Sequence, residues 1–309
     1  MRRRTPTRRH AGVSTSPRST APSASENRRW NTANLPLPQL TCTASCSASI
    51  RTRSDSMEFF DCNVYYGKPP VPTYRIAPTV ADLLAEMDWN GIGEALVTSA
   101  QQRYDDPVTA NSQILRDCAG EPRLHPTWVI LPCQTGEFPG PDALATALRQ
   151  AQVKALWAFP SRNKYLLDRN TFGPTLELLS DLQVPLFISL TDSSGPYSGW
   201  ALMSAILADF PRLTLVAADQ DCWGQDRFFR PLVEKYPRFY FDVYEFELAH
   251  GYKDYCDKYG PDRMLFASGF PGINMGAQMF NLLHADIRED WKEAIAGGNL
   301  RRLLAEVKL

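Results

Sequence analysis

Histidine is scarce in this sequence. Only four of the 309 residues are histidines, His10, His125, His250 and His284, so a histidine-rich metal or catalytic centre has few possible sources. Long apolar runs are missing too: no stretch approaches the roughly 20 residues that a membrane-spanning helix needs, and no signal-peptide core follows the first arginines. We therefore expect neither a membrane protein nor one exported by the Sec route.

The seven cysteines are odd in number, scattered, and free of C-x-x-C spacing. This pattern argues against a zinc ribbon and against a disulfide framework. A reducing compartment, with the cytoplasm as the first choice, is the expected setting.

Lysine is absent from residues 1–56, which carry ten arginines and only two acids, Glu26 and Asp55. This segment has a net charge of +8, and residues 57–309 have a net charge of −9. Ser and Thr make up nearly a third of the segment, so it cannot bury enough apolar surface to offset chain entropy. We expect residues 1–56 to be a disordered extension and residues 57–309 to form one domain.

Three explanations of the extension stay open. An Arg- and Ser-rich, acid-poor composition is typical of a transit peptide, which would make the protein organellar. The arginines are also compatible with a functional tail. Alternatively, the true start is Met57, because it directly precedes a strand-like run and because arginine without lysine is what translated GC-rich noncoding DNA would give. The acidic body shows no basic stripe, so we expect no nucleic-acid partner.

From Met57 the sequence alternates short apolar runs with helical patterns, which is typical of βα units around a parallel sheet. Eight runs are predicted as strands: 59–64, 94–98, 127–131, 153–159, 186–190, 213–218, 239–244 and 264–268. Eight such units favour a (β/α)8 TIM barrel, an α/β fold, over a doubly wound sheet. The strand of the seventh unit is short and its helix, 248–259, contains Gly251, so the sequence signals are weakest for this unit.

Helix boundaries have their own signals. Thr79 with Asp82 predicts a capping box that opens a helix over 80–89, and Asn90 with Gly91 predicts its left-handed end.

In a TIM barrel, chemistry lies where the strands end. Asn63 and Tyr65 end the first strand, and both are expected to face the barrel mouth because alternate residues of a strand point the same way. Ser189 and Ser268 lie at the ends of the fifth and eighth strands, where each hydroxyl either binds a ligand or satisfies a neighbouring backbone group. These four residues are predicted to bind substrate. Aromatic residues of the predicted loops, Trp157, Phe159 and Tyr244 among them, are either pocket lining or core.

Three carboxylates, Asp219, Asp221 and Glu245, follow neighbouring strands and are predicted to form a cluster. Such a cluster is compatible with general acid–base catalysis, with binding of Mg²⁺ or Mn²⁺, or with an acidic rim paired with Arg227 and Arg230. Asp219 and Glu245 are the predicted catalytic residues. The thiols of Cys62 and Cys133 have no histidine placed to activate them and are interpreted as structural.

Three segments of the body resemble the amidohydrolase-related superfamily, in its branch of aminocarboxymuconate-semialdehyde-type decarboxylases and barrel hydrolases. Residues 60–67 (FDCNVYYG) align with the D-x-H-x-H start of that family. Residues 262–271 (DRMLFASGFP) align with its D-R-I-L-F-G-S-D-Y-P strand, and residues 298–304 (GNLRRLL) with its closing G-N-A-R-R-L-L helix. The resemblance spans nearly all of residues 57–309 and implies a TIM barrel.

The resemblance also implies a divalent metal, usually zinc, bound by four histidines and one aspartate at strand ends. In this sequence those positions hold Asn63, Tyr65, Ser189, Asp219 and Gly269. Only Asp219 carries a usual metal-binding group. We therefore expect neither a metal nor another cofactor, and no activation of a metal-bound water.

Two functions stay open. The first is a small-molecule-binding or regulatory pseudoenzyme subunit, as a homodimer or in a hetero-oligomer with an active paralogue. The second is a metal-independent hydrolase of a small carboxylated substrate, cleaving a lactone, amide or C–C bond. In that case Asp219 or Glu245 would act as the base, and Asn63, Tyr65 and Ser189 would hold the carbonyl oxygen. The fold alone does not decide between them.

Overall fold

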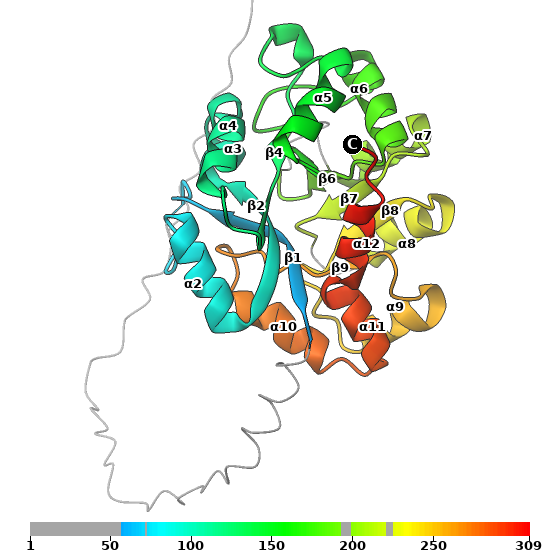
Figure 1. Cartoon of the computed structure of the whole chain (residues 1–309). Helices are drawn as coiled ribbons and strands as arrows, with labels where there is room; N and C mark the ends of the chain where they lie inside the picture. Colours follow the sequence, from blue (N-terminus) through cyan, green and yellow to red (C-terminus); the bar gives the residue numbers. More distant parts are fainter. Residues whose placement is uncertain (1–56, 72, 193–198, 221–224) are drawn as a thin grey trace, which may run out of the picture. The chain divides into compact units, whose positions relative to one another are not determined.

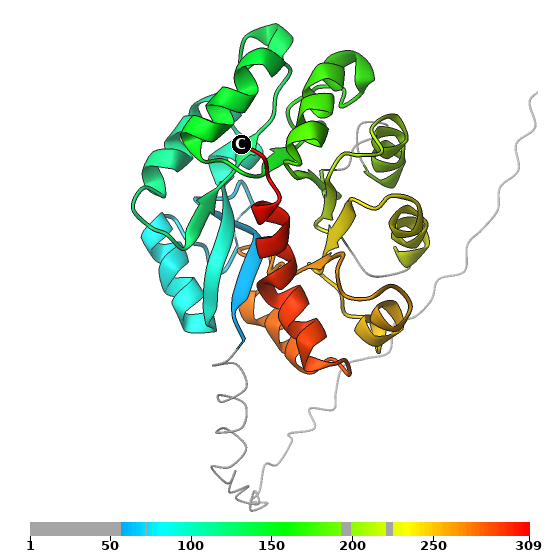
Figure 2. The ribbon, with the colours of Figure 1, turned by 45° about the vertical axis from the view of Figure 1, so that its right-hand side comes forward.

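The computed structural model describes residues 57–71, 73–192, 199–220 and 225–309 (Figure 1). The predicted extension, 1–56, lies outside the described residues, and its nature stays a prediction. In the described chain, parallel strands alternate with helices, and the helices surround the strands (Figures 1 and 2). The predicted α/β TIM barrel is confirmed.

All eight predicted strands are present, and the third is split in two. The strands are β1 (Phe59–Tyr66), β2 (Ile92–Ser99), β3 (Leu124–Pro126), β4 (Trp128–Val129), β5 (Leu156–Ala158), β6 (Leu186–Ser189), β7 (Leu215–Ala218), β8 (Phe239–Asp242) and β9 (Met264–Leu265). β1 to β3 form one parallel sheet and β4 to β9 a second. The ring closes between its ends because the Cys62 N–H donates to the Phe266 carbonyl at 2.9 Å and the Gly269 N–H donates to the Asn63 carbonyl at 3.2 Å.

The helices follow the strands in order. They are α2 (Val80–Asn90), α3 (Ala100–Tyr104), α4 (Pro107–Asp117), α5 (Pro141–Ala151), α6 (Arg169–Leu182), α7 (Gly199–Asp209), α8 (Asp226–Lys235), α9 (Gly251–Tyr259), α10 (Met275–Leu283), α11 (Glu289–Glu293) and α12 (Asn299–Ala305), with the short 3-10 helix η1 (Cys133–Thr135) and the π-helix η3 (Ala294–Gly298). None of the helices in the described part of the chain combines the length and the apolar character that crossing a bilayer requires.

The predicted helix signals are mostly confirmed. The Thr79 hydroxyl accepts the Asp82 N–H and the Asp82 carboxylate accepts the Thr79 N–H, so α2 opens with a full capping box. Gly91 ends α2 in the left-handed region, with φ 77°. The prediction for the seventh unit was wrong at its start: α9 begins at Gly251 rather than at 248, so this glycine stands at the helix N-terminus, where it costs less than inside.

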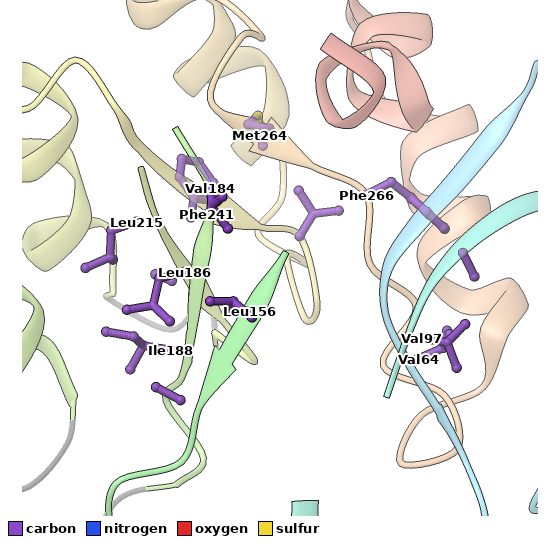
Figure 3. Packing of buried hydrophobic residues seen from close by; sticks show 14 of the residues in the cluster. Val64, Val97, Leu156, Val184, Leu186, Ile188, Leu215, Phe241, Met264 and Phe266 are labelled. Atoms are coloured by element: carbon purple, nitrogen blue, oxygen red, sulfur yellow. The ribbon is translucent and has the colours of Figure 1, made fainter. Parts of the chain in front are cut away.

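The buried side chains form two layers. An outer layer packs the strands against the helices, and Figure 3 shows part of it, with Leu186, Ile188 and Leu215 on the larger sheet and Val64 and Val97 on the smaller. An inner layer fills the barrel. Its members are Phe60, Cys62, Leu96, Val129, Ala155, Trp157, Phe159, Phe187, Val216, Ala218, Tyr240, Leu265, Ala267, Leu300, Leu303 and Leu304. The last three belong to α12, so this helix plugs the end of the barrel at which the strands begin.

The third strand changes partners halfway along. The sequence predicted it over 127–131, but it begins at Leu124 and is interrupted at Thr127. Its first half pairs with β2, where Ala95 aligns with Leu124, and its second half pairs with β5, where Trp128 aligns with Leu156. Pro126 lacks an N–H and cannot continue a ladder, which is one physical reason for the break.

Side chains of α3 and α4 take over the hydrogen bonds that β2 leaves. The Asn111 carboxamide accepts the Val129 N–H at 2.8 Å and donates to the Val129 carbonyl at 2.9 Å. Gln102 donates to the Thr127 carbonyl at 2.8 Å and to the Asn111 oxygen at 2.9 Å. These amides mimic a neighbouring strand, so the buried backbone of the third strand stays satisfied beyond the end of β2.

We predict that Asn111→Ala lowers the free energy of unfolding by about 2–4 kcal/mol, because it leaves a buried N–H and a buried carbonyl of Val129 without partners. Chemical denaturation followed by circular dichroism measures this loss. Ser112→Ala, an exposed change on the same helix, is the control and is expected to stay within about 0.5 kcal/mol of the original protein. Equal stability of the two variants would contradict the strand-mimic role of Asn111.

Candidate functional site

Asn63 is the centre of a polar network at the barrel mouth. Its carboxamide nitrogen donates to Asp219 at 2.6 Å and to Asp242 at 3.1 Å, and its oxygen accepts from the Arg103 guanidinium at 2.7 Å. The residue is 1% exposed. The charges on both sides fix the orientation of the amide, because a flipped carboxamide would turn its oxygen toward two carboxylates and its N–H groups toward a cation.

Asp219 enters the network through an unusual backbone turn. It follows β7 directly and has φ 57°, in the left-handed region that non-glycine residues rarely adopt and that aspartate tolerates better than most of them. Its N–H donates to the Asp242 carboxylate at 3.0 Å. Its own carboxylate accepts from the Ser189 hydroxyl and, at 3.3 Å, from Thr191. The turn thus joins the ends of β6, β7 and β8.

Arg103 places a buried positive charge in the mouth. It lies on α3, immediately after β2, and is 4% exposed. Besides Asn63, it donates to the Thr98 hydroxyl at 2.6 Å. Its guanidinium carbon lies 4.8 Å from the ring centroid of Tyr65 and 4.6 Å from that of Trp157, so aromatic faces cover part of the cation.

The buried carboxyls beside this cation hold their protons to unusually high pH. Burial, with the nearby charge of Asp219, raises the pKa of Asp242 to about 7 despite hydrogen bonds from Asn63 and from backbone N–H groups. Burial likewise raises the pKa of Asp61 to about 6, against hydrogen bonds from Ser268 and Asn63 that lower it. A carboxyl that titrates near neutrality is suited to give and take a proton.

Tyr244 covers the end of the eighth barrel strand. Gly269 has φ 71°, and a Cβ added there would lie 2.1 Å from Cε2 of the Tyr244 ring. Burial raises the pKa of the Tyr244 phenol, and the nearby charge of Asp219 raises it further. The aromatic ring therefore occupies the space into which any side chain at position 269 would project.

The residues at the five strand-end positions do not fit a divalent metal. The Asn63 N–H groups point at carboxylates, its oxygen is bound to a guanidinium, and the ring of Tyr244 fills the space beside Gly269. Within the described ranges, no group of three or more His, Cys, Asp and Glu side chains is placed to hold a metal ion. We derive no chemistry from a metal at this site.

The structure brings together most of the residues that the sequence singled out. Asn63, Ser189 and Asp219 are hydrogen-bonded to one another in a chain, and Tyr65 packs on the arginine that contacts Asn63. The Ser268 hydroxyl accepts the Phe270 N–H at 3.2 Å, so at least one of its bonds satisfies the backbone. Whether any of the four predicted binding residues contacts a ligand stays a prediction.

The sequence predicted Glu245 as the carboxylate beside Asp219, but the carboxylate that binds the same Asn63 amide nitrogen as Asp219 is Asp242. Glu245 lies three residues later, beyond the end of β8 and half-buried, and its catalytic role stays a prediction. Asp221 lies outside the described residues. Arg230, proposed from the sequence as a partner of the acidic rim, instead pairs with Asp226 and Asp254 on the helical surface.

Sequence reasoning missed Arg103, Asp242 and Thr98. Asp242 is the last residue of β8, and its position as a polar residue at a strand end is a signal that the sequence contains. Arg103 is harder to find, because it comes from the helix after β2 and only its burial distinguishes it from a surface arginine. Trp157 and Phe159 prove to be inner-layer residues that also line the cation.

Comparisons with known proteins agree with this fold. A family model described as amidohydrolase matches residues 67–305. No curated protein sequence matches the chain. Among solved structures, a TIM-barrel protein from Bordetella bronchiseptica has 18% identity and a TM-score of 0.61, covering 81% of this chain and 99% of that one.

Two decarboxylases are similar to a like extent. The 5-carboxyvanillate decarboxylase of Sphingomonas paucimobilis has 16% identity and a TM-score of 0.61, covering 81% of this chain and 99% of its own. A dihydroxybenzoic acid decarboxylase of Polaromonas sp. JS666, solved with manganese and the inhibitor 2-nitroresorcinol, has 17% identity and a TM-score of 0.60, covering 81% and 97%. At these identities the likeness shows the shared fold.

We predict that Gly269→Ala lowers the free energy of unfolding by about 3 kcal/mol or more, since overpacking against Tyr244 adds to the cost of a left-handed alanine. In a Tyr244→Ala background the same change is expected to cost only about 1 kcal/mol. Denaturant unfolding of the four proteins gives this double-mutant cycle.

Gly91→Ala is the matched control for this cycle. Its φ of 77° is close to that of Gly269, and nothing lies within 4 Å of an added Cβ, so only the backbone cost of a left-handed alanine remains. Identical costs of Gly269→Ala with and without Tyr244 would show that the ring does not occupy this space.

We predict that Asp219→Asn lowers the pKa of Asp242, because it removes a neighbouring negative charge, while exposed Glu247→Gln leaves that pKa unchanged. Carbon-detected NMR titration of the Asp242 carboxyl measures both. Because the folded pKa is above the unfolded one, the folded protein binds more protons between about pH 4 and pH 7, and the stability due to Asp242 falls as pH rises through that window. A titration midpoint near 4 would contradict the prediction that burial and the charge of Asp219 raise the pKa of Asp242.

Proposed function

The chain belongs to the amidohydrolase family, and on that premise we propose that it is a member that works without a divalent metal, as a small-molecule-binding or regulatory protein. Assembly with itself, or with a relative that keeps the metal ligands, is part of this proposal. So is a location in the cytoplasm, or in an organelle if residues 1–56 are a transit peptide. The motive is that four of the five ligand positions lack a metal-binding group while the fold-defining segments remain.

The observation that carries the proposal is the hydrogen-bonded network of Arg103, Asn63, Asp219 and Asp242. A metal at this place would have to displace a buried guanidinium that makes two hydrogen bonds at 2.6 and 2.7 Å. It would also meet the N–H donors of Asn63 instead of imidazole nitrogens. A cation that belongs to the protein thus already balances the carboxylates.

The same cation indicates what the mouth would bind. A guanidinium at the mouth is a good partner for a carboxylate. The two decarboxylases of similar fold are named for aromatic carboxylates. We therefore propose a small carboxylated compound as the ligand, with 2,6-dihydroxybenzoate and 5-carboxyvanillate as the first probes.

Metal analysis and ligand titration together test the proposal. The full chain, expressed with zinc and manganese supplements, is expected to purify with far less than one metal ion per chain and to leave both probes chemically unchanged. Calorimetry is expected to show binding that Arg103→Gln weakens by about tenfold or more, because a charge-assisted hydrogen bond is lost. Arg116→Gln, an exposed change on α4, is the control and is expected to bind normally. Stoichiometric metal that Asp219→Asn removes would overturn the proposal.

One observation favours the second candidate, a metal-independent hydrolase. Asp242, with a pKa of about 7, binds the same Asn63 amide nitrogen as Asp219, so a carboxyl that can give or take a proton near neutral pH lies beside a second carboxylate. Turnover of a lactone or amide that falls at least a hundredfold in both Asp219→Asn and Asp242→Asn would establish this candidate in place of the first. Turnover lost only in Glu245→Gln would assign the base to Glu245.

A further inference from the structure

A cavity lies at the end of the barrel opposite the mouth, where the strands begin. Its volume is about 420 Å³, within the range of small-molecule sites. It is lined by Phe60, Glu94, Leu96, Leu124, His125, Pro126, Gln152, Lys154, Arg301, Leu304 and Ala305. None of these residues takes part in the network at the barrel mouth. The inner aromatic stack of Trp157 on Phe159 and Phe187 lies among the residues that fill the barrel between the two ends.

The cavity exists because the third strand changes partners. In its first half, β3 pairs with β2 only, and pairing with β5 starts at Trp128 and Leu156. Leu124 and His125 therefore face Lys154, just before β5, across a seam that no ladder of the described strands closes. Pro126 adds no N–H that could bridge the seam.

The floor of the cavity is apolar. Phe60, Leu96 and Leu304 belong to the inner layer of the barrel, and Leu124 extends this surface. Only a small part of each side chain faces the cavity, because Phe60 and Leu96 are each 2% exposed and Leu304 is 6% exposed, and a ligand with an apolar body would cover that part.

The rim carries charged side chains, and they differ in whether they have ion-pair partners. Both oxygens of Glu94 are occupied, one by Arg301 Nε at 3.0 Å and the other by His125 Nε2 at 2.8 Å. Arg301 also pairs with Glu58 at 3.4 Å. Lys154 is exposed and, across the ranges that the structure describes, its ammonium has no ion-pair partner. The rim thus offers one cation to an incoming anion, and its one lining carboxylate is already bound.

We infer that this cavity binds a small carboxylate with an apolar tail: the tail lies on Phe60, Leu96 and Leu304, and the carboxylate binds Lys154. A purely polar ligand would leave the apolar floor uncovered. The geometry disfavours a cationic ligand, because Arg301 and Lys154 would repel it.

Calorimetric titration of the full chain with octanoate tests this inference. Octanoate is expected to bind saturably, acetate is not, because it lacks the tail, and octanamide is expected to bind about tenfold more weakly because it lacks the charge. Lys154→Gln is expected to weaken octanoate binding by about tenfold, and Ala305→Trp, which fills the cavity, to abolish it. Both positions are exposed, so neither change threatens the fold.

The control is Lys68→Gln, which removes the same charge from an exposed position just beyond the end of β1, at the mouth of the barrel. It is expected to bind octanoate as the original protein does. Absence of saturable binding would overturn the inference, as would octanoate binding by Lys154→Gln and Ala305→Trp that equals binding by the original protein. So would binding that Arg103→Gln removes and Lys154→Gln leaves intact, because that result would place octanoate at the mouth.

Discussion

A buried guanidinium holds the barrel mouth together. Three carboxyls, Asp61, Asp219 and Asp242, lie in or beside a site that is almost closed to water, and ionised carboxylates without compensation are costly there. Arg103 supplies one positive charge, which Asp219 balances. The other two carboxyls take up protons near neutrality, as their pKa values of about 6 and about 7 indicate. Below about pH 6, where both of these carboxyls are protonated, the charge of the site therefore comes close to zero without any added ion.

The path that brings Arg103 to this place runs through the break in the third strand. β2 ends at Ser99, and α3 begins at once with a capping box in which the Ser99 hydroxyl accepts the Gln102 N–H. The same short helix carries Gln102, which substitutes for a strand by bonding to Thr127, and Arg103, which points into the mouth. α3 thus supplies both the hydrogen bond that satisfies Thr127 and the buried cation of the mouth. The third strand needs that hydrogen bond because it changes its pairing from β2 to β5, and the same change opens the cavity at the other end of the barrel.

The sequence allowed the barrel, its eight strands and part of the polar network at the mouth, namely Asn63, Ser189 and Asp219, to be predicted, because these depend on local signals. Apolar runs indicate the strands, Thr79 with Asp82 indicates a helix start, and strand ends indicate where polar residues gather. The split at Thr127 could not be predicted, since the hydrogen bonds that stabilise it come from Asn111 on the preceding helix and are invisible to periodicity. Arg103 could not be predicted for the same reason. An arginine on a short helix has the sequence pattern of a surface residue, and only its contacts in the folded chain show that it is buried.

The substitutions at the strand ends depend on one another. Asn63 needs carboxylates on its N–H side, which Asp219 and Asp242 provide, and a cation on its oxygen side, which Arg103 provides. An imidazole at position 63 would lose the hydrogen bonds on one of these two sides. A carboxylate at position 269 would meet the ring of Tyr244. Restoring a single ligand would therefore create a clash or an unpaired buried group. The mouth is self-consistent as a polar network, because the orientation of each of these groups depends on the charges of its neighbours.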